Sequence, residues 1–475
     1  MSGAERTRVV IVGGGIAGAA AAEELRTLLP DAELLVLEAS ERVGGKLHRV
    51  ELAGSTIDVG AEAMLARRPE ALDLATRVGL RSAVIHPATT KAALWTRGSL
   101  RPMPPTIMGV PADLDALAES GVVSRVGMIR ATVQRRQTPV ADDVSVGDYV
   151  ASQLGDEVCD RLLEPLLGGV YAGHARSLSL RAAAPQIAAL AERDGSLVEA
   201  AAQVYGERPA SGGQVFAGLR SGVGQLVPAA LEASGATVRS GATVRELHRV
   251  ESGGWHLVVG PTTGVERIYA DAVVLATPAA PTARLLSAHA SVAAAELGAI
   301  EYASMAIVSL AVPRFAIGGL PDSSGFLVPP IDGRAIKAAT ISSRKWGWLD
   351  EASGDLVVLR ASLGRAGEAE LLQRTDAELV ALAVGDLHEA VGLSGQPVDS
   401  HVQRWGGALP QYAVGHLDRV RRIDDSLAGV PGVEVCGAAY AGVGIPAVIA
   451  TARAAAARAA DHLAKLSAAG ERMMP

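Results

Sequence analysis

The sequence predicts an α/β fold organised around a Rossmann-like unit near its start. Residues 9–12 (Val-Val-Ile-Val) and 34–37 (Leu-Leu-Val-Leu) are short apolar runs, separated by a glycine turn and an alanine-rich segment. Such runs are typical of parallel strands buried on both faces, and the segment between them favours a crossover helix. A similar pattern closes the chain: a strand at 432–436, glycines at 437–444 and an alanine-rich helix to about residue 466. Strands that alternate with helices predict a parallel sheet.

The first glycine turn reads Gly13-x-Gly15-x-x-Gly18. Its first glycine permits a tight turn, the second lets the backbone approach a pyrophosphate, and the third lets the helix pack closely on the strand. The pyrophosphate would lie at the helix N-terminus, against unpaired N–H groups and the positive end of the dipole. Glu38 follows the second strand, about 20 residues after Gly18, where a carboxylate can bind a ribose hydroxyl pair. The sequence therefore predicts a dinucleotide site; the alternative is a tight strand–helix turn without a ligand.

Composition narrows the function classes. With 475 residues, 49% hydrophobic and 20% charged, the chain is long enough for about three folded domains. A net charge of −7 without a basic run argues against a nucleic-acid surface. The two cysteines, Cys159 and Cys436, form no C-x-x-C pair, so we expect neither a redox dithiol nor a cysteine-built metal site, and the count suits the cytoplasm. No apolar run reaches the length of a transmembrane helix.

The middle of the chain changes from strand patterns to helical ones and back to strands. A short strand at 55–59 enters a second glycine turn at 60–64, and a helix at 69–78 and a hairpin at 92–102 follow. Helical patterns fill 104–205, including a capping box from Ser145 to Asp148 and one helix over 182–202 around Pro185. Strand patterns return at 214–216, 236–238, 243–247, 255–259, 272–277, 307–310 and 356–359, and a helix is predicted over 376–391.

The pattern of turns indicates a flavin. Only one strand–glycine–helix nucleotide motif is present, so a second site for a nicotinamide is not expected. A flavin can accept a hydride and then be reoxidised by dioxygen without leaving the protein. A C-terminal helix that starts near Ile445 would place its positive end against the pyrimidine ring, where reduced flavin gathers negative charge. Simple strand–helix packing is the alternative for that turn.

These motifs resemble the flavin-dependent porphyrinogen oxidases, a branch of the amine-oxidase and phytoene-desaturase superfamily. The resemblance covers nearly the whole chain, and its matching blocks are residues 13–18, 38–46, 58–60, 94–102, 164–171, 404–416 and 436–446. It implies a discontinuous FAD-binding domain (1–80, 206–285 and 399–475), an α+β substrate domain (81–103 and 286–398) and a helical insertion (104–205).

The resemblance also implies the cofactor contacts. These are Gly13, Gly14, Gly15, Ile16, Ala17, Gly18, Glu38, Ala39, Arg42, Lys46, Gly60, Ala61, Glu62, Ala63, the backbone of Val244, Trp405, Val443, Gly444 and Ile445. Lys46 replaces the arginine common in the superfamily. Residues 406–409 (Gly-Gly-Ala-Leu) carry no cysteine where amine oxidases attach flavin, so the FAD is expected to be non-covalent.

By this resemblance the chain is most similar to the soluble bacterial type that oxidises coproporphyrinogen III, with protoporphyrinogen IX as the alternative substrate. Hydride would pass from a methylene bridge to flavin N5 three times, with dioxygen reduced to peroxide. No catalytic acid or base stands out. The competing interpretations are an amine or carotenoid oxidoreductase and a flavin-binding carrier without turnover. Whether two subunits pair as a homodimer is left open. We expect at most peripheral membrane contact, at residues 107–110.

Four propionates on the substrate call for cations, because guanidinium pairs well with carboxylate. We favour Arg67 and Arg68, which directly follow the second glycine turn; Lys91, Arg176, Arg344 and Lys345 are further candidates, and each could equally be a surface cation. His174, His416 and Tyr171 are candidates to line the pocket or to serve as core residues.

Overall fold

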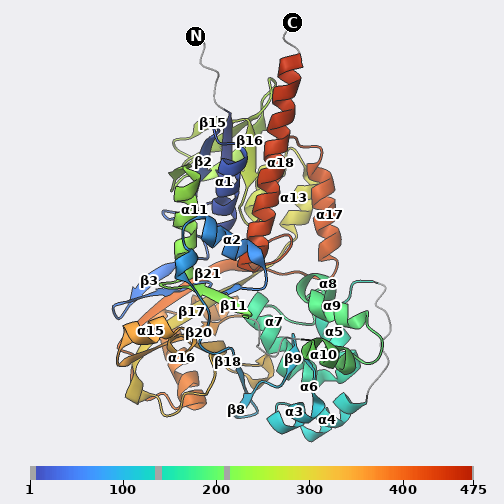
Figure 1. The fold of residues 1–475 in the computed structure, drawn as a ribbon, viewed down its shortest axis with the longest axis vertical. Helices are drawn as coiled ribbons and strands as arrows, with labels where there is room; N and C mark the ends of the chain where they lie inside the picture. Colours follow the sequence, from blue (N-terminus) through green and yellow to red (C-terminus); the bar gives the residue numbers. More distant parts are fainter. Residues whose placement is uncertain (1–6, 134–141, 208–213, 473–475) are drawn as a thin grey trace.

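The computed structural model describes residues 7–133, 142–207 and 214–472. Figure 1 shows three parts: an upper body that holds both ends of the described chain, a sheet at the lower left, and a group of helices at the lower right.

A five-stranded parallel sheet forms the centre of the upper body. Its order is β12-β2-β1-β16-β22, with bounds Thr237–Arg239, Glu33–Leu37, Arg8–Val12, Ala272–Leu275 and Val433–Val435. The strands come from widely separated parts of the sequence. Residues 9–12 of β1 are almost wholly buried, as expected for a parallel strand covered on both faces. The predicted α/β fold class is confirmed.

Helices α1 (Ile16–Leu28), α11 (Leu226–Ser234) and α18 (Ile445–Arg472) cover one face of this sheet (Figure 1). The alanines of α1 at 19–22 have no exposed surface, and their small side chains let α1 pack closely on the sheet and against its neighbours α11 and α18. The other face is covered by a small antiparallel sheet and three helices: β13 (Val244–Arg249), β14 (Trp255–Val259), β15 (Glu266–Ala270), α12 (Ala279–Leu286), α13 (Ser291–Gly298) and α17 (His416–Leu427).

A seven-stranded mixed sheet forms the lower left part. Its order is β21-β17-β20-β19-β18-β7-β8, with bounds Asp399–Pro410, Tyr302–Pro313, Leu356–Leu363, Ile336–Ile341, Gly325–Leu327, Ala93–Thr96 and Ser99–Pro102. Helix α16 (Asp376–Val391) packs on one face. The hairpin of β3 (Arg49–Leu52) and β4 (Ser55–Asp58) packs on the other, with α15 (Gly347–Ser353). The family resemblance assigns residues 399–410 to the cofactor domain. In the structure they form strand β21, at one edge of this sheet.

The lower right part is helical and has its own apolar core. Its helices are α3 (Leu114–Ser120), α4 (Arg125–Thr132), α5 (Val146–Leu154), α6 (Asp156–Val158), a π-helical turn η2 (Cys159–Leu163), α7 (Glu164–Tyr171), α8 (Leu180–Ala183), α9 (Pro185–Ala191) and α10 (Leu197–Gly206). The prediction of one helix over 182–202 is wrong. Ala184 before Pro185 leaves the helical conformation, and Ser196 forms a capping box with Glu199 that starts a new helix.

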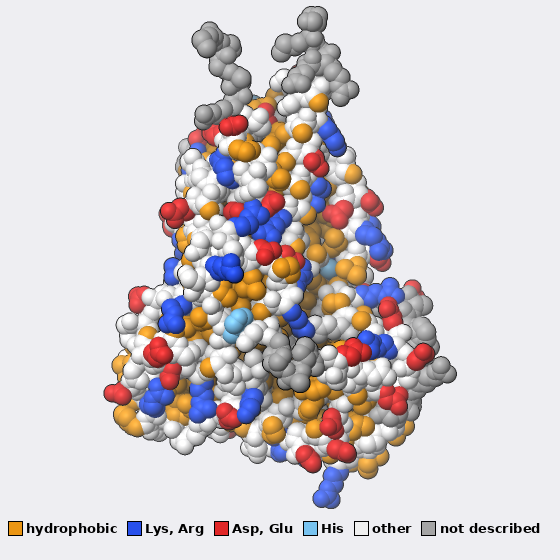
Figure 2. Space-filling model, in the orientation of Figure 1, with side chains coloured by type: hydrophobic (Ala, Val, Ile, Leu, Met, Phe, Trp, Pro, Cys, Tyr) orange, Lys and Arg blue, Asp and Glu red, His pale blue; other side chains and the backbone are white. Residues whose placement is uncertain are grey.

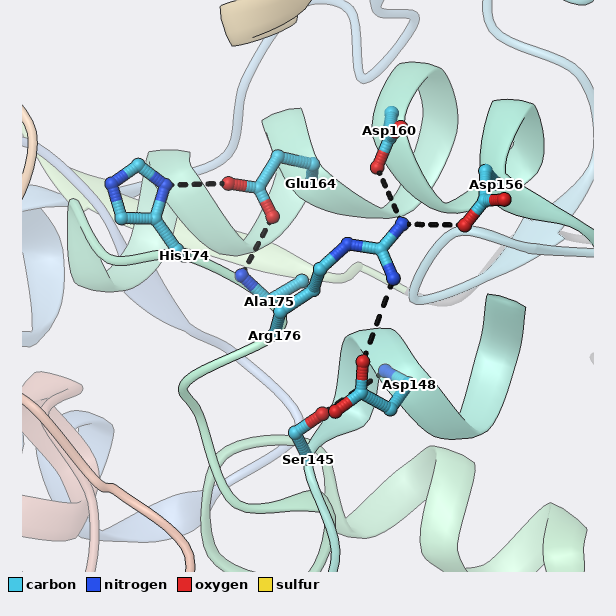
Figure 3. A network of polar contacts seen from close by, with 8 residues as sticks. All are labelled: Ser145, Asp148, Asp156, Asp160, Glu164, His174, Ala175 and Arg176. Atoms are coloured by element: carbon cyan, nitrogen blue, oxygen red, sulfur yellow. Dashed lines mark hydrogen bonds and ion pairs between the residues drawn. The ribbon is translucent and has the colours of Figure 1, made fainter. Parts of the chain in front are cut away.

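The expected capping box at Ser145 forms only in part. The Ser145 hydroxyl accepts from the Asp148 N–H at 3.0 Å, as an N-cap does. The Asp148 carboxylate instead turns to Arg176, 3.5 Å away (Figure 3).

The remaining described elements are short connections: β5 (Met64–Leu65), α2 (Pro69–Arg77), β6 (Val84–Ile85), β9 (Thr106–Ile107), β10 (Val110–Pro111), β11 (Phe216–Leu219), α14 (Ser342–Lys345) and single turns of 3₁₀-helix. Within the described ranges, no helix is long and apolar enough to cross a bilayer. On the face drawn in Figure 2, basic and acidic side chains are interspersed and not gathered by sign.

Candidate active site

The first glycine turn connects β1 to α1 with the geometry that its spacing predicts. Gly13 has a φ of +112°, and a Cβ there would lie 2.9 Å from the Ala276 carbonyl oxygen. A Cβ on Gly18 would lie 1.8 Å from the Gly13 carbonyl oxygen, so only glycine lets α1 start this close to the strand. At Gly15 the nearest atom to an added Cβ is 4.0 Å away, on Gly45. The turn is therefore closed at two glycines and open at the one expected to face a pyrophosphate.

Glu38 lies at the carboxyl end of β2 and faces this turn. One of its carboxylate oxygens accepts from the Gly14 N–H at 2.7 Å, and the other from the Ser40 N–H at 2.8 Å. The Glu38 N–H donates to the Arg239 carbonyl at 2.9 Å, and the Ala242 N–H donates to the Glu38 carbonyl at 2.8 Å. Val244, a predicted cofactor contact, begins β13 two residues after Ala242. It therefore directly follows a segment that is hydrogen-bonded to Glu38.

The second predicted loop, residues 42–46, lies directly against the first turn. The Gly44 N–H donates to the Gly14 carbonyl at 2.8 Å. The Arg42 guanidinium folds back over its own loop onto the carbonyls of Val43 and Gly45, at 3.2 and 3.1 Å. Burial lowers the pKa of the Lys46 ammonium, and no acceptor among the described residues contacts it. This loop therefore brings Gly45 next to the open side of the turn at Gly15, and the adjacent Lys46 has an ammonium without a partner among the described residues.

Trp405 of β21 joins the same group of residues. Its indole N–H donates to the Val59 carbonyl at 3.0 Å, and the Arg42 guanidinium carbon lies 5.9 Å from its ring centroid. An added Cβ on Gly60 would lie 3.3 Å from the Trp405 ring and 1.9 Å from the Lys46 carbonyl oxygen. The close approach of these segments requires glycine at position 60.

Glu62 has its carboxylate in a buried ion network. Lys345 donates to one oxygen at 2.6 Å, and Arg360 of β20 pairs with the other. Arg360 also donates to the Gly60 carbonyl at 2.5 Å. Burial raises the pKa of Glu62, but the two cations outweigh it and hold that pKa at about 2. The turn at 60–63 is thus fixed to strand β20 of the seven-stranded sheet by Arg360 and to the end of α14 by Lys345.

Sequence reasoning missed Arg360. It is 7% exposed and stands inside the apolar strand β20, Leu-Val-Val-Leu-Arg-Ala-Ser-Leu. A buried arginine in such a run requires a carboxylate partner, which is the signal that was available.

The C-terminal turn brings a second helix N-terminus to this region. Gly437 and Gly442 have φ values of +125° and +136°, and α18 starts at Ile445. An added Cβ on Gly437 would lie 3.9 Å from the Cβ of Ala17 in α1, and Ile16 and Ile445 share one core. The structure therefore brings the turn before α18 next to the start of α1.

Most of the predicted substrate cations already have carboxylate partners. Arg68 pairs with Glu70 at 2.5 Å, Lys91 with Asp322 at 2.6 Å, and Lys345 with Glu62; Arg344 lies 3.8 Å from Asp322. Figure 3 shows Arg176 among Asp148, Asp156 and Asp160, at 3.5, 2.8 and 3.1 Å. Arg67 is exposed and has no side-chain partner in the described ranges, so it is the candidate with a free guanidinium.

The predicted aromatic and histidine residues are buried or bonded. One ring nitrogen of His174 bonds to Glu164 at 3.0 Å (Figure 3). The other bonds to the Ala366 carbonyl, also at 3.0 Å. The Glu164 hydrogen bond raises the pKa of His174. His416 and Tyr171 are 0% and 5% exposed. A surface groove of about 910 Å³ lies along α16 and residues 393–402, and it includes none of the predicted site residues.

The two glycine turns, the end of β2 and the start of α18 fit a dinucleotide cofactor, because they combine an open turn, a carboxylate and an unpaired cation. Comparison with known protein families identifies which dinucleotide cofactor this is. Residues 16–460 match the model of the flavin containing amine oxidoreductases. The chain belongs to this family. It is an FAD-dependent oxidoreductase, and the predicted fold class, cofactor and resemblance are confirmed.

Similar proteins refine the position of the chain within this family. The coproporphyrinogen III oxidase of Mycobacterium tuberculosis (strain ATCC 25618 / H37Rv) is 38% identical over 446 residues, covering 92% of this chain and 94% of that protein. The coproporphyrinogen III oxidase of Bacillus subtilis (strain 168) is 30% identical, with 96% and 99% covered. A crystal structure of a candidate protoporphyrinogen oxidase from Exiguobacterium sp. 255-15 matches with a TM-score of 0.85 and 31% identity, covering 97% of this chain and all of that one.

Proposed function

We propose that this protein oxidises coproporphyrinogen III to coproporphyrin III, with dioxygen as the electron acceptor. The observation that carries the proposal is the similarity to two coproporphyrinogen III oxidases, at 38% and 30% identity over more than nine-tenths of each chain. Protoporphyrinogen IX is the second candidate substrate, favoured by the name given to the Exiguobacterium protein.

In this proposal the glycine turn at 13–18 holds the FAD pyrophosphate and Glu38 holds a ribose. Lys46 offers a positive charge that the described residues leave unpaired. Trp405 and the turn at 60–63 border the flavin, and residues 443–445 bring the N-terminus of α18 to it. The remaining contacts implied by the resemblance, from Ala39 to Val244, belong to the same proposal.

Bound FAD supplies a hydride acceptor that dioxygen reoxidises. The growing aromaticity of the product drives the reaction. The task left to the residues of the chain is therefore to place the macrocycle beside the flavin and to exclude water. No catalytic acid or base is assigned. Arg67 is the cation offered to a propionate, since its guanidinium has no partner in the described ranges.

A cytoplasmic location belongs to this proposal and agrees with two buried, unpaired cysteines. Membrane contact and pairing of subunits stay predictions.

Anaerobic titration tests the function. The purified yellow protein is mixed, without oxygen, with coproporphyrinogen III or with protoporphyrinogen IX, and the flavin absorbance and porphyrin fluorescence are followed. We expect bleaching by coproporphyrinogen III, and steady peroxide release once air is admitted. Faster bleaching by protoporphyrinogen IX would favour the second substrate, and an unchanged flavin with both would refute the proposal.

A further inference from the structure

The turn before α18 is held by two side chains from one short segment, Tyr412 and His416. The Tyr412 hydroxyl donates to the Ala438 carbonyl at 2.6 Å and accepts from the Gly442 N–H at 2.8 Å. The His416 Nε2–H donates to the Tyr440 carbonyl at 3.1 Å. Three alternate residues of the turn are therefore bonded to this pair of side chains.

This turn has a conformation that needs outside support. Gly437 and Gly442 both have φ values in the region that side-chain-bearing residues avoid. An added Cβ on Gly442 would lie 2.7 Å from the Ala447 Cβ, inside the first turn of α18. Since Ile445 starts the helix three residues later, the path of the turn determines where the helix N-terminus points.

The two supporting rings are rigid. Tyr412 is 1% exposed and His416 is 0% exposed, and their rings stack with centroids 3.9 Å apart and planes 13° apart. Burial raises the pKa of the Tyr412 phenol and lowers that of His416 to about 4, so both side chains are neutral near pH 7. A neutral imidazole that donates from Nε2 matches the carbonyl it faces.

The same segment is anchored on the helical part of the molecule. The Ser179 N–H donates to the Tyr412 carbonyl at 2.7 Å. The Gln411 amide donates to the Tyr171 carbonyl at 2.8 Å, and the Gly415 N–H donates to Asp143 at 2.8 Å. The segment thus connects the helical insertion to the turn before α18.

We propose that Tyr412 and His416 are positioning residues that fix the N-terminus of α18 against the flavin and couple the helical insertion to the cofactor. This inference rests on the proposed FAD contacts at 443–445. A helix N-terminus held in place stabilises the negative charge that reduced flavin gathers. Loss of the two bonds should therefore weaken cofactor binding and lower the flavin midpoint potential.

Tyr412→Phe tests the inference, because it removes one hydroxyl and keeps the ring. Tyr171→Phe is the matched control: its ring lies 5.5 Å from that of Tyr412, it is also buried, and its hydroxyl bonds to Ala183 at 3.4 Å, away from the turn. The FAD dissociation constant, the flavin midpoint potential and the thermal midpoint are measured for both holoproteins. We expect Tyr412→Phe to weaken FAD binding roughly tenfold, since a buried donor and acceptor lose their partner, and to lower the potential. The control should change FAD binding by less than about twofold.

His416→Phe is the second variant, and it decides the matter if Tyr412→Phe does not fold. It keeps a stacked ring, loses the donor to Tyr440, and should shift the same two quantities in the same direction. The inference is overturned if the folded variants lose only thermal stability and keep the wild-type affinity and potential. Wild-type protein that binds FAD but does not oxidise a porphyrinogen would overturn the proposed function alone, and the FAD measurements would still decide this inference.

Discussion

Glu62→Gln should lower the free energy of unfolding by about 3 kcal/mol at pH 7. Folding moves the pKa of this carboxyl from 4.5 to about 2, and at about 1.4 kcal/mol per pKa unit this amounts to roughly 3 kcal/mol. The neutral amide would leave Lys345 and Arg360, whose side chains are 17% and 8% exposed, without their carboxylate. Removing one partner of a buried ion pair commonly costs about 3–5 kcal/mol, which agrees.

The sign of the pH dependence provides the sharper test. Because the folded pKa is depressed, the stability that Glu62 contributes is fully present above pH 4.5 and is lost as the pH falls toward 2. Urea unfolding of the FAD-saturated wild type and variant, followed by tryptophan fluorescence, should show a gap at pH 7 that narrows below pH 4.5. Glu70→Gln, which breaks the more exposed pair with Arg68, is the control and should cost less than about 1 kcal/mol. A Glu62→Gln gap under about 1 kcal/mol at pH 7, or one that does not depend on pH, would refute the reasoning.

Substitutions at four other positions have defined outcomes. Gly18→Ala places a Cβ 1.8 Å from a carbonyl oxygen and should yield protein without flavin absorbance, whereas Gly15→Ala, with 4.0 Å of space, should fold with an unchanged circular dichroism spectrum but bind FAD more weakly. The raised pKa of His174 means that its bond to Glu164 contributes stability that is fully present below pH 6.5 and is lost as the pH rises through the folded value, so His174→Gln should flatten the fall of the thermal midpoint above pH 6.5. Arg67→Ala should raise the KM for coproporphyrinogen III roughly tenfold with kcat little changed, and Arg67→Lys should recover part of it; an unchanged KM would exclude Arg67 from substrate binding.

Elements bounded by local signals could be predicted from the sequence. Helix α16 has the predicted bounds, 376–391, because Thr375 and Glu378 form a capping box at its start and Gly392 takes a left-handed conformation after its end. The region 182–202 was predicted less well. Its break before Pro185 and its new start at Ser196 are also local signals, but the alanine-rich composition on both sides of them favours a single helix.

The same distinction holds for the candidate site, where local motifs could be predicted from the sequence and long-range contacts could not. The glycine turns and Glu38 are adjacent in sequence to the strands that position them, so their spacing alone indicates a nucleotide site. Arg360 and Glu62 are separated by 298 residues, and nothing near either residue indicates the other. Two of the predicted substrate cations, Lys91 and Arg176, pair with carboxylates that only the folded chain brings close, whereas the partner of Arg68 is its sequence neighbour Glu70.

The parallel sheet has a consequence for the life of the chain in the cell. Its strand β22 and the helix that follows come from residues 433–472, although β1 is made first. A chain cut short near residue 430 therefore lacks one edge strand of this sheet and the helix beside α1. Such a chain would expose the alanine face of α1 to water and to proteases.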